Sequence, residues 1–364
     1  MKVKEISKYI ETLAPLNYQE SYDNAGLIVG DNNMEVSGVL IALDSTEEVI
    51  QEAIKKECNL VIAHHPIVFG GLKKLTGKNY VERTVIMAVK NDIAIYAAHT
   101  NLDSVIGGVN TKIADLLKLS NQQILDPVSN ELLKLVTFVP KADADKVRNA
   151  ICEAGAGHIG NYDFCTYNVQ GEGTFRGGEE ADPHVGKKGE LHFEPEVRIE
   201  TIIPKSLKSS VVSALLQSHP YEEVAYDLYA LENIYKEVGI GVIGTLPEPI
   251  DEKVFLARIK EIFKTALVKH TQLLNKPIRK IAVCGGSGSF LLKKAMAAKA
   301  DIFISGDFKY HEYFDADSKI VIADIGHFES EQFTKDVFYE LLIKKFPNFA
   351  VCLSEVRTNP VYYF

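Results

Sequence analysis

The chain has 364 residues, of which 46% are hydrophobic and 24% are charged, and a formal net charge of -9 at pH 7. This length allows two or three domains with a substantial buried core, and the composition is that of an ordinary globular protein. The acidic balance argues against a broad nucleic-acid-binding surface, and no apolar run is long enough to cross a bilayer. The chain opens without a signal-peptide pattern, so we expect a cytoplasmic protein with no membrane partner.

The five cysteines are scattered along the chain. Their number is odd and no two of them form a CxxC pair, which argues against a disulfide framework and against a thiolate zinc site. Most of them are expected to be small buried side chains. They are Cys58, Cys152, Cys165, Cys284 and Cys352.

After an amphipathic stretch at the N-terminus, the first third alternates between short β-branched runs and helical patterns. The predicted strands are 39–43, 60–63 and 93–97, and the predicted helices are 46–57, 80–91 and 110–117. This alternation indicates βαβ units and a largely parallel sheet. Ser45 or Thr46 is expected to cap the first of these helices, with Glu48 near N3. Asp44, at the end of a strand, is either a turn residue or a site residue.

The composition changes between residues 126 and 235. The predicted strands there are 132–139, 163–170, 198–204 and 225–231, and the predicted helices are 143–154 and 206–218. This order suits a small ferredoxin-like α+β sandwich inserted into a larger fold. The glycine-rich stretch 171–178 is interpreted as an exposed loop.

The last third returns to alternating elements. The predicted strands are 281–284, 302–305, 320–323 and 350–353, and the predicted helices are 289–300 and 331–346. Two α/β halves therefore bracket the middle segment. A weak duplication is our hypothesis, because 60–65 resembles 301–307 and 92–103 resembles 319–327, each being a strand that ends in ligand-type side chains.

Ligand-type side chains follow three of the predicted strands. His64 and His65 come after one strand, Asp103 after the next, and His327 after a strand in the last third. Because ligands collect at the carboxyl ends of parallel strands, these segments can converge. Glu331 lies four residues beyond His327, so both can share one face of a helix that begins near Gly326.

Imidazole and carboxylate donors without thiolate suit zinc, manganese, iron or nickel. Each motif alone is more often a surface pair, a chance pair or a turn than a metal ligand, and only their combination points to a metal. Five ligands exceed what a closed tetrahedral site requires, which favours a dinuclear centre with open positions.

Other residues leave two interpretations open. His99 is a site residue or a core histidine, and His311, after Gly306-Asp307, is a proton donor or a surface histidine. The stretch 285–289 offers either backbone N–H groups for an anion or a tight turn. The stretch 23–27 is a turn or the edge of a cleft.

Six motifs taken together resemble the NIF3-like family, also called GTP cyclohydrolase I type 2 homologues. The motifs are Tyr22-Asp23-Asn24-Ala25-Gly26-Leu27, Ala63-His64-His65-Pro66, Ala98-His99-Thr100-Asn101-Leu102-Asp103, Gly285-Gly286-Ser287-Gly288, Ser305-Gly306-Asp307 and Gly326-His327 with Glu331. The resemblance covers both outer thirds of the chain. It implies an α/β NIF3-like fold of two related halves with mostly parallel sheets.

The resemblance also implies a site and an assembly. Two divalent ions per subunit are expected, zinc first, with iron, manganese or nickel as alternatives. The implied assembly is a homohexameric ring. The implied ligands are His64, His65, Asp103, His327 and Glu331.

The domain organisation follows from the same resemblance. Residues 1–127 and 237–364 are expected to form the two halves of the NIF3-like core. Residues 128–236, with the stretch 219–227, look like the insert domain of longer family members, which is similar to the PII and CutA1 folds.

Two functions remain open. The family name implies a metal-dependent hydrolase acting on a nucleotide or related phosphorylated compound, with His99 and His311 as proton shuttles. The alternative is a metal-loaded hexameric ring that acts as a binding or regulatory module without turnover. The substrate is expected from family analogy alone.

Overall fold

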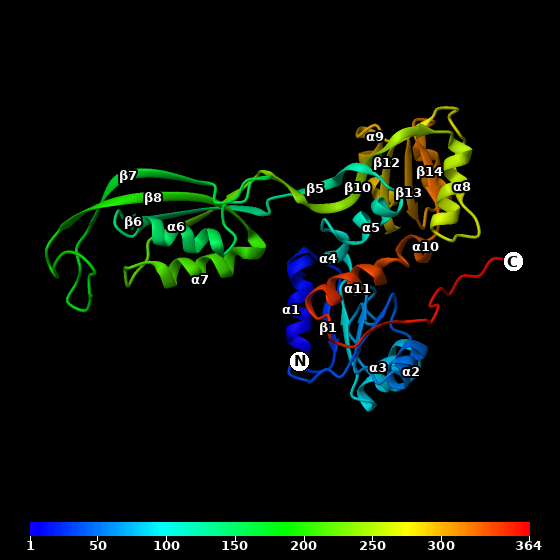
Figure 1. The fold of residues 1–364 in the computed structure, drawn as a ribbon, viewed down its shortest axis with the longest axis horizontal. Coiled ribbons are helices and arrows are strands. Elements are labelled where there is room, and N and C mark those ends of the chain that lie inside the picture. Colours follow the sequence, from blue (N-terminus) through cyan, green and yellow to red (C-terminus); the bar gives the residue numbers. More distant parts are fainter. The chain divides into compact units, whose positions relative to one another are not determined.

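The structure is a computed structural model that describes residues 1–364. The chain forms two compact units. Unit 1 consists of Met1–Pro127 and Lys236–Phe364, and unit 2 consists of Val128–Tyr235 (Figure 1). No helix combines the length and the apolar character that crossing a membrane requires.

The first sheet of unit 1 has the order β1-β4-β3-β2-β15, and only β1 runs antiparallel to its neighbour. Its strands are β1 (Gly26–Val29), β2 (Val39–Ala42), β3 (Leu60–Ala63), β4 (Ala94–Ala97) and β15 (Val351–Leu353). Every residue of β2, β3 and β4 is buried, as expected for parallel strands that are covered on both faces. The predicted central strands are confirmed within one residue, whereas the sequence analysis missed β1.

Helices cover both faces of this sheet. Alternate strand residues such as Leu40, Val61 and Ile95 pack with α2 (Glu47–Lys55) and α3 (Tyr80–Lys90). The intervening residues face a larger core that includes α1 (Val3–Leu13) and α11 (Thr334–Lys345). Thr46 is the residue that caps α2, because its side chain accepts a hydrogen bond from the Val49 N–H at 3.4 Å.

The second sheet of unit 1 has the order β11-β14-β13-β12-β10-β5. Its strands are β5 (Ser120–Ser129), β10 (Ile234–Ile250), β11 (Lys269–His270), β12 (Ile278–Ser287), β13 (Ile302–Gly306) and β14 (Val321–Asp324). The central strands β12, β13 and β14 are parallel and follow one another in order, as β2, β3 and β4 do in the first sheet. The mixed α/β class with mostly parallel sheets in the core is therefore confirmed.

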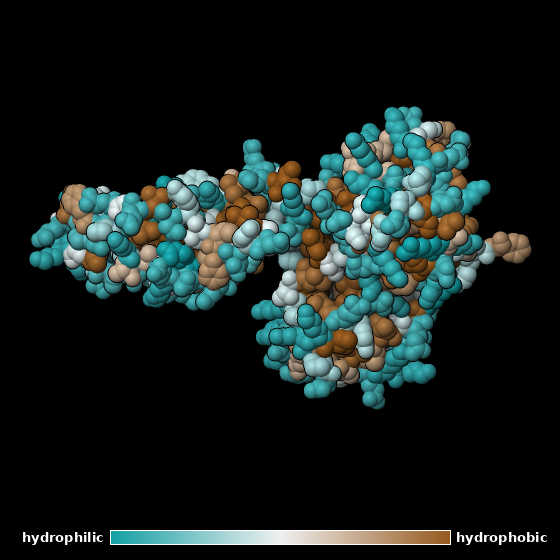
Figure 2. Space-filling model, turned by 45° about the horizontal axis from the view of Figure 1, so that its top comes forward, coloured by the Kyte–Doolittle hydropathy of each residue, from teal (hydrophilic) through white to brown (hydrophobic).

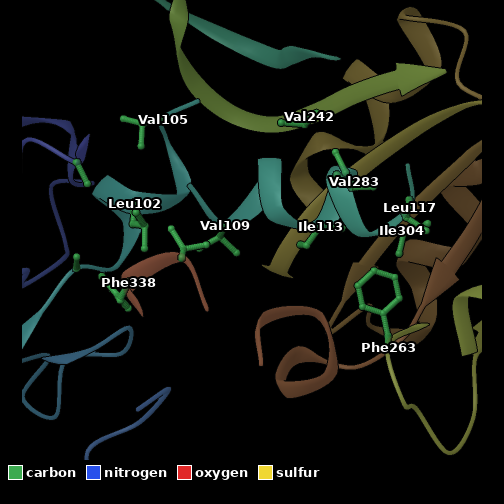
Figure 3. Packing of buried hydrophobic residues seen from close by; sticks show 14 of the residues in the cluster. Leu102, Val105, Val109, Ile113, Leu117, Val242, Phe263, Val283, Ile304 and Phe338 are labelled. Atoms are coloured by element: carbon green, nitrogen blue, oxygen red, sulfur yellow. The ribbon is translucent and has the colours of Figure 1, made fainter. Parts of the chain in front are cut away.

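One buried cluster joins the two sheets of unit 1. Figure 3 shows Val109 and Ile113 of α5 (Val109–Leu116) between Phe338 of α11 and Val283 of β12. Helix α8 (Glu252–Ile262) adds Phe255 to the same cluster. Both sheets therefore pack against shared helices, and this shared core fixes the ends of their strands relative to one another.

The helical boundaries of the last third differ from the prediction. The predicted helix 331–346 is two helices, α10 (His327–Glu331) and α11, and the predicted helix 289–300 is a 3-10 turn (Ser289–Leu291) followed by α9 (Leu292–Ala297). Helix α8 was not predicted at all. Asp251 caps this helix and accepts hydrogen bonds from Lys253 N–H and Val254 N–H. An aspartate at this place could have indicated the start of a helix.

Unit 2 contains an antiparallel sheet with the order β7-β8-β6-β9. Its elements are β6 (Leu132–Pro140), α6 (Ala144–Glu153), β7 (Thr166–Phe175), β8 (His192–Pro204), α7 (Lys208–Ser218) and β9 (Tyr226–Leu231). The order βαββαβ is that of a ferredoxin-like unit. Its assignment to the PII or CutA1 folds stays a prediction. Figure 2 shows hydrophobic side chains on the surface of this unit, and the exposed ones include Ile159, Phe193 and Ile234.

The predicted loop 171–178 is wrong in its first part, because β7 continues to Phe175 and pairs with His192 of β8. Glycine within a strand marks a close approach rather than a turn here. A Cβ atom on Gly173 would lie 2.2 Å from the Glu196 carboxylate, so glycine allows this carboxylate to lie against the strand.

The packing of α8 in the shared core predicts that substitutions on its buried and exposed faces differ in their effect on stability. Phe255→Ala should lower the free energy of unfolding of unit 1 by about 3–5 kcal/mol, because Phe255 is fully buried. Val254→Ala is the control, since Val254 is 55% exposed, and should change it by less than about 0.5 kcal/mol. Urea denaturation of both variants measures the difference. Equal losses would contradict the placement of α8.

Candidate metal centre

The predicted ligands lie after the carboxyl ends of strands from both sheets of unit 1. Strand β3 ends at Ala63, and the N–H groups of His64 and His65 both donate to the Leu43 carbonyl at 3.0 Å. Strand β4 is followed by His99 and by the short helix α4 (Thr100–Asp103). Strand β14 leads through Gly326 into α10, so His327 and Glu331 lie one turn apart.

The five predicted ligand side chains meet at one place. Glu331 Oε2 lies 3.0 Å from His65 Nε2 and 3.1 Å from His327 Nε2. The other oxygen, Glu331 Oε1, lies 3.8 Å from His64 Nε2. Asp103 Oδ1 completes the set at 3.6 Å from His64 Nε2. The i to i+4 pair on α10 therefore reaches the histidine pair that follows β3.

These donor atoms fall into groups that could each hold a metal ion. One group is His65, His327 and Glu331, and a second is His64, Asp103 and Glu331. Glu331 belongs to both groups and presents a different oxygen to each. A third group, His64, His65 and His99, brings His99 within reach of the same place.

Two buried atoms that could ligate a metal have no hydrogen-bond partner in the protein. They are His64 Nε2 and Asp103 Oδ1. Leaving such atoms unpaired costs free energy, and a cation between them would satisfy both. Two ligand atoms 2.0–2.2 Å from one tetrahedral ion lie roughly 3.3–3.6 Å apart, and the observed 3.6 Å between these two atoms agrees with that spacing. The donor set therefore fits a metal ion.

Each imidazole is held through its second nitrogen. His64 Nδ1 lies 2.9 Å from the Ala98 carbonyl, His65 Nδ1 lies 2.7 Å from Asp44 Oδ1, and His327 Nδ1 lies 2.6 Å from Asp307 Oδ2. An Nδ1–H that donates to oxygen leaves Nε2 as the ligating atom. The three rings are thus oriented before any ion binds.

The carboxylates around the site raise the pKa of two of its imidazoles. Burial opposes the charged form of His65, but hydrogen bonds with Asp44 and Glu331 outweigh it and raise the pKa of His65 to about 10. Burial likewise opposes the charged form of His327, whereas Asp307 and Glu331 raise the pKa of His327 to about 11. Burial, together with the charge of Glu331, raises the pKa of Asp103 to about 7.

Two carboxylates hold imidazoles of the site: Asp44, which the sequence left open as a turn residue or a site residue, and Asp307, to which the sequence gave no separate role. Asp44 follows β2, Asp307 follows β13, and both therefore lie at the same sheet edges as the ligands. Asp23, which the sequence left as a turn or a cleft-edge residue, accepts a hydrogen bond from His99 Nδ1 at 2.8 Å and from Thr100 N–H at 3.0 Å. An aspartate directly after a strand was the available signal for the first two.

The structure separates the two predicted proton shuttles. The ring of His99 lies 5.2 Å from that of His64 and 5.4 Å from that of His65, centroid to centroid. His311 is exposed, is not among the residues that line the cavity, and packs against Tyr310 and Phe314. Only His99 is brought to the cluster.

The first three residues of the glycine-rich stretch 285–289 form the end of strand β12, so this part of it is neither a tight turn nor an anion cradle. The Gly285 N–H donates to Asn110 Oδ1 at 2.8 Å and the Gly286 N–H donates to Ser330 Oγ at 2.9 Å, so neither is free for a ligand. A Cβ atom on Gly286, whose φ is +58°, would lie 2.4 Å from Glu331 Oε1. Glycine is required here because the Glu331 carboxylate lies directly against the backbone.

A cavity of about 1180 Å³ surrounds the cluster. Its wall carries many acidic side chains but only one lysine or arginine, Lys269, whose Nζ lies 2.5 Å from Asp324 Oδ2. The aromatic rings of the wall are Tyr22, Phe69, Tyr80, Phe290, Phe328 and Tyr363. The cavity therefore offers flat aromatic surfaces and an acidic wall around a centre of imidazoles and carboxylates.

Comparison with known proteins gives consistent matches over the whole chain. A family model described as Duf34/NIF3 (NGG1p interacting factor 3) matches residues 1–360. A protein named GTP cyclohydrolase 1 type 2 homolog from Halalkalibacterium halodurans is 41% identical over 360 residues, which cover 98% of this chain and 97% of the relative. The protein of the same name from Bacillus subtilis is 38% identical over 363 residues, with the same coverage of 98% and 97%.

Solved structures show the same relationship. A Bacillus cereus protein related to NIF3 is 38% identical, with a TM-score of 0.88 over 100% of this chain and 99% of that one. HcgD from Methanocaldococcus jannaschii, in its reduced form, is 21% identical with a TM-score of 0.58 and covers 98% of both chains. The second likeness concerns the fold alone.

The raised pKa values predict that metal binding releases protons. With these pKa values, His65 and His327 are protonated at pH 7 in the metal-free site and Asp103 is about half protonated. All three must be deprotonated to ligate, so roughly two to three protons per chain should leave. Affinity should therefore fall as the pH is lowered. Calorimetric titration of Zn²⁺ in buffers of different ionisation enthalpy measures the release. Asp44→Asn should reduce it, and a binding enthalpy independent of the buffer would contradict the assignment.

Proposed function

Because the chain belongs to the Duf34/NIF3 family, we propose that it binds two divalent metal ions and hydrolyses a nucleotide or related phosphorylated compound. The observation that carries this proposal is the shared carboxylate. Two groups of possible ligands meet at Glu331, and each group faces a different oxygen of that side chain. A carboxylate used in this way is typical of a bridge between two ions.

In this proposal His64 and Asp103 would hold one ion, His65 and His327 would hold the other, and Glu331 would contribute one oxygen to each. Zinc is the first candidate, and iron, manganese and nickel suit the same donors. When bound, such a pair supplies a Lewis acid and lowers the pKa of water near it. The homohexameric ring and the cytoplasmic location expected from the resemblance belong to the same proposal.

His99 is proposed as the residue that moves a proton. Its Nδ1 is held by Asp23, so Nε2 is the nitrogen left to take up or give back a proton in the cavity. His99 Nδ1 and Asp23 Oδ1 are 2.8 Å apart, a distance that keeps the ring in one orientation. His311 lies outside the cavity, so the proposed proton transfer rests on His99 alone.

The cavity wall supports a flat heterocyclic substrate. Rings such as Phe69 and Phe290 offer stacking surfaces beside the cluster. Lys269 is the cation of the wall and the candidate contact for a phosphate group. GTP is the first compound to test because the relatives are named after a GTP cyclohydrolase.

A second candidate function is a binding or regulatory module without turnover. Unit 2 has its own cavity of about 660 Å³. Rings of Phe138, Phe175 and Tyr221 line it, together with the Arg198 and Glu196 side chains. A cavity of this size that combines aromatic rings with charged side chains can hold a small polar molecule, which favours a sensing role for unit 2.

The metal assignment predicts a stoichiometry. The protein loaded with Zn²⁺ should retain about two equivalents per chain after desalting. Glu331→Gln should retain fewer than about one, because the bridge lacks its charge. Glu340→Gln is the control, since its exposed ion pair with Lys112 lies on the surface. Elemental analysis gives the result, and equal metal content in all three proteins would remove the site assignment.

The hydrolase assignment predicts that one variant loses activity alone and another loses both activity and metal. Metal-loaded protein should consume at least one member of a nucleotide panel that begins with GTP, with formate release followed for ring opening. His99→Ala should keep its metal and lose about 100-fold or more in kcat, whereas Glu331→Gln should lose both. No turnover above that of Glu331→Gln with any nucleotide would favour the binding module.

A further inference from the structure

Residues 354–363 form a segment that lies against the metal cavity. Ser354 anchors its start, because its carbonyl accepts a hydrogen bond from Lys335 Nζ at 2.9 Å and its Oγ donates to Glu52 Oε2 at 2.5 Å. Further along, Asn359 is 4% exposed and its Nδ2 donates to Glu329 Oε1 at 3.0 Å. Thr358, between these two anchors, lines the cavity. The segment is therefore fixed on both sides of Thr358.

Thr358 is connected to the cluster by a short series of hydrogen bonds. Its hydroxyl donates to Asp44 Oδ2. The other oxygen, Asp44 Oδ1, lies 2.7 Å from His65 Nδ1, and His65 Nε2 lies 3.0 Å from Glu331 Oε2. Both oxygens of the Asp44 carboxylate are thus engaged, one by the hydroxyl and one by the imidazole.

We propose that Thr358 is a positioning residue for the metal site, acting through Asp44 on the orientation of His65. This inference rests on the proposed function of the cluster. A carboxylate held at one oxygen only can rotate about its Cβ–Cγ bond, whereas one held at both oxygens keeps its plane. The side chain of Asp44 is 32% exposed, so water would compete for the free oxygen if the threonine hydroxyl were absent.

The two groups of ligands differ in this respect. Asp307, which holds His327, has a side chain that is 49% exposed and makes no second contact comparable to that of Thr358. Thr358 therefore supports only one of the two ion-binding positions. Loss of its hydroxyl should lower the metal affinity of that position and not of the other. The effect belongs to the position that contains His65.

The test is a titration of metal-free full-length protein with Co²⁺, followed through its visible absorption bands. Thr358→Val removes the hydroxyl with little change in volume and should weaken one of two binding steps by about tenfold, the low end for a lost outer-shell partner. Thr358→Ser should restore the affinity and the spectrum. Thr334→Val is the matched control, because Thr334 Oγ1 is buried without a hydrogen-bond partner.

A double-mutant cycle with Asp44→Asn decides whether Thr358 acts through Asp44. If it does, Thr358→Val should have little further effect on Co²⁺ affinity in the Asp44→Asn background. Additive losses, or a wild-type affinity and spectrum in Thr358→Val, would overturn the inference. If the wild-type chain bound no Co²⁺, the proposed metal function itself would be wrong, and this inference would fail with it. Equal melting temperatures of all variants exclude a loss of folding as the cause.

Discussion

The Glu331 carboxylate, 3% exposed and surrounded by imidazoles, is the constraint on which the rest of unit 1 depends. A carboxylate cannot be buried alone, because the loss of its hydration costs several kcal/mol unless positive or donor groups replace the water. The groups that do so here are His327, on the same helix, and His65, which comes from the opposite sheet. The shared core around Val109 and Ile113 is what holds the two sheets close enough for this contact.

The backbone near Glu331 reflects the same constraint. The glycines at 285 and 286 leave room for the carboxylate, and their N–H groups bond to protein acceptors instead of a ligand. The imidazoles are oriented by hydrogen bonds between their Nδ1 atoms and carboxylates or a carbonyl. The chemistry of the cavity thus depends on residues that an ion would never touch, such as Asp44 and Thr358.

Much of this could be predicted from the sequence, because strands β2, β3 and β4 and the helices between them carry strong local patterns. The five ligand-type residues were also visible, since each follows a strand or lies one turn beyond another. The contact between Thr358 and Asp44 could not be predicted, because it joins residues 314 positions apart that share no periodic pattern. The predicted strand in this region ended too early for a different reason. Gly173 of β7 makes room for the Glu196 carboxylate, whereas the glycine content of the stretch made it look like a loop.

The distance along the chain between His65 and Glu331 has a consequence for biosynthesis. The two residues are 266 positions apart, and all of unit 2 is translated between them. A ribosome therefore releases the histidine pair long before it makes the carboxylate that complements it, and domains generally form in the order of synthesis. An ion held by both residues could therefore be captured only after all of unit 2 has been synthesised.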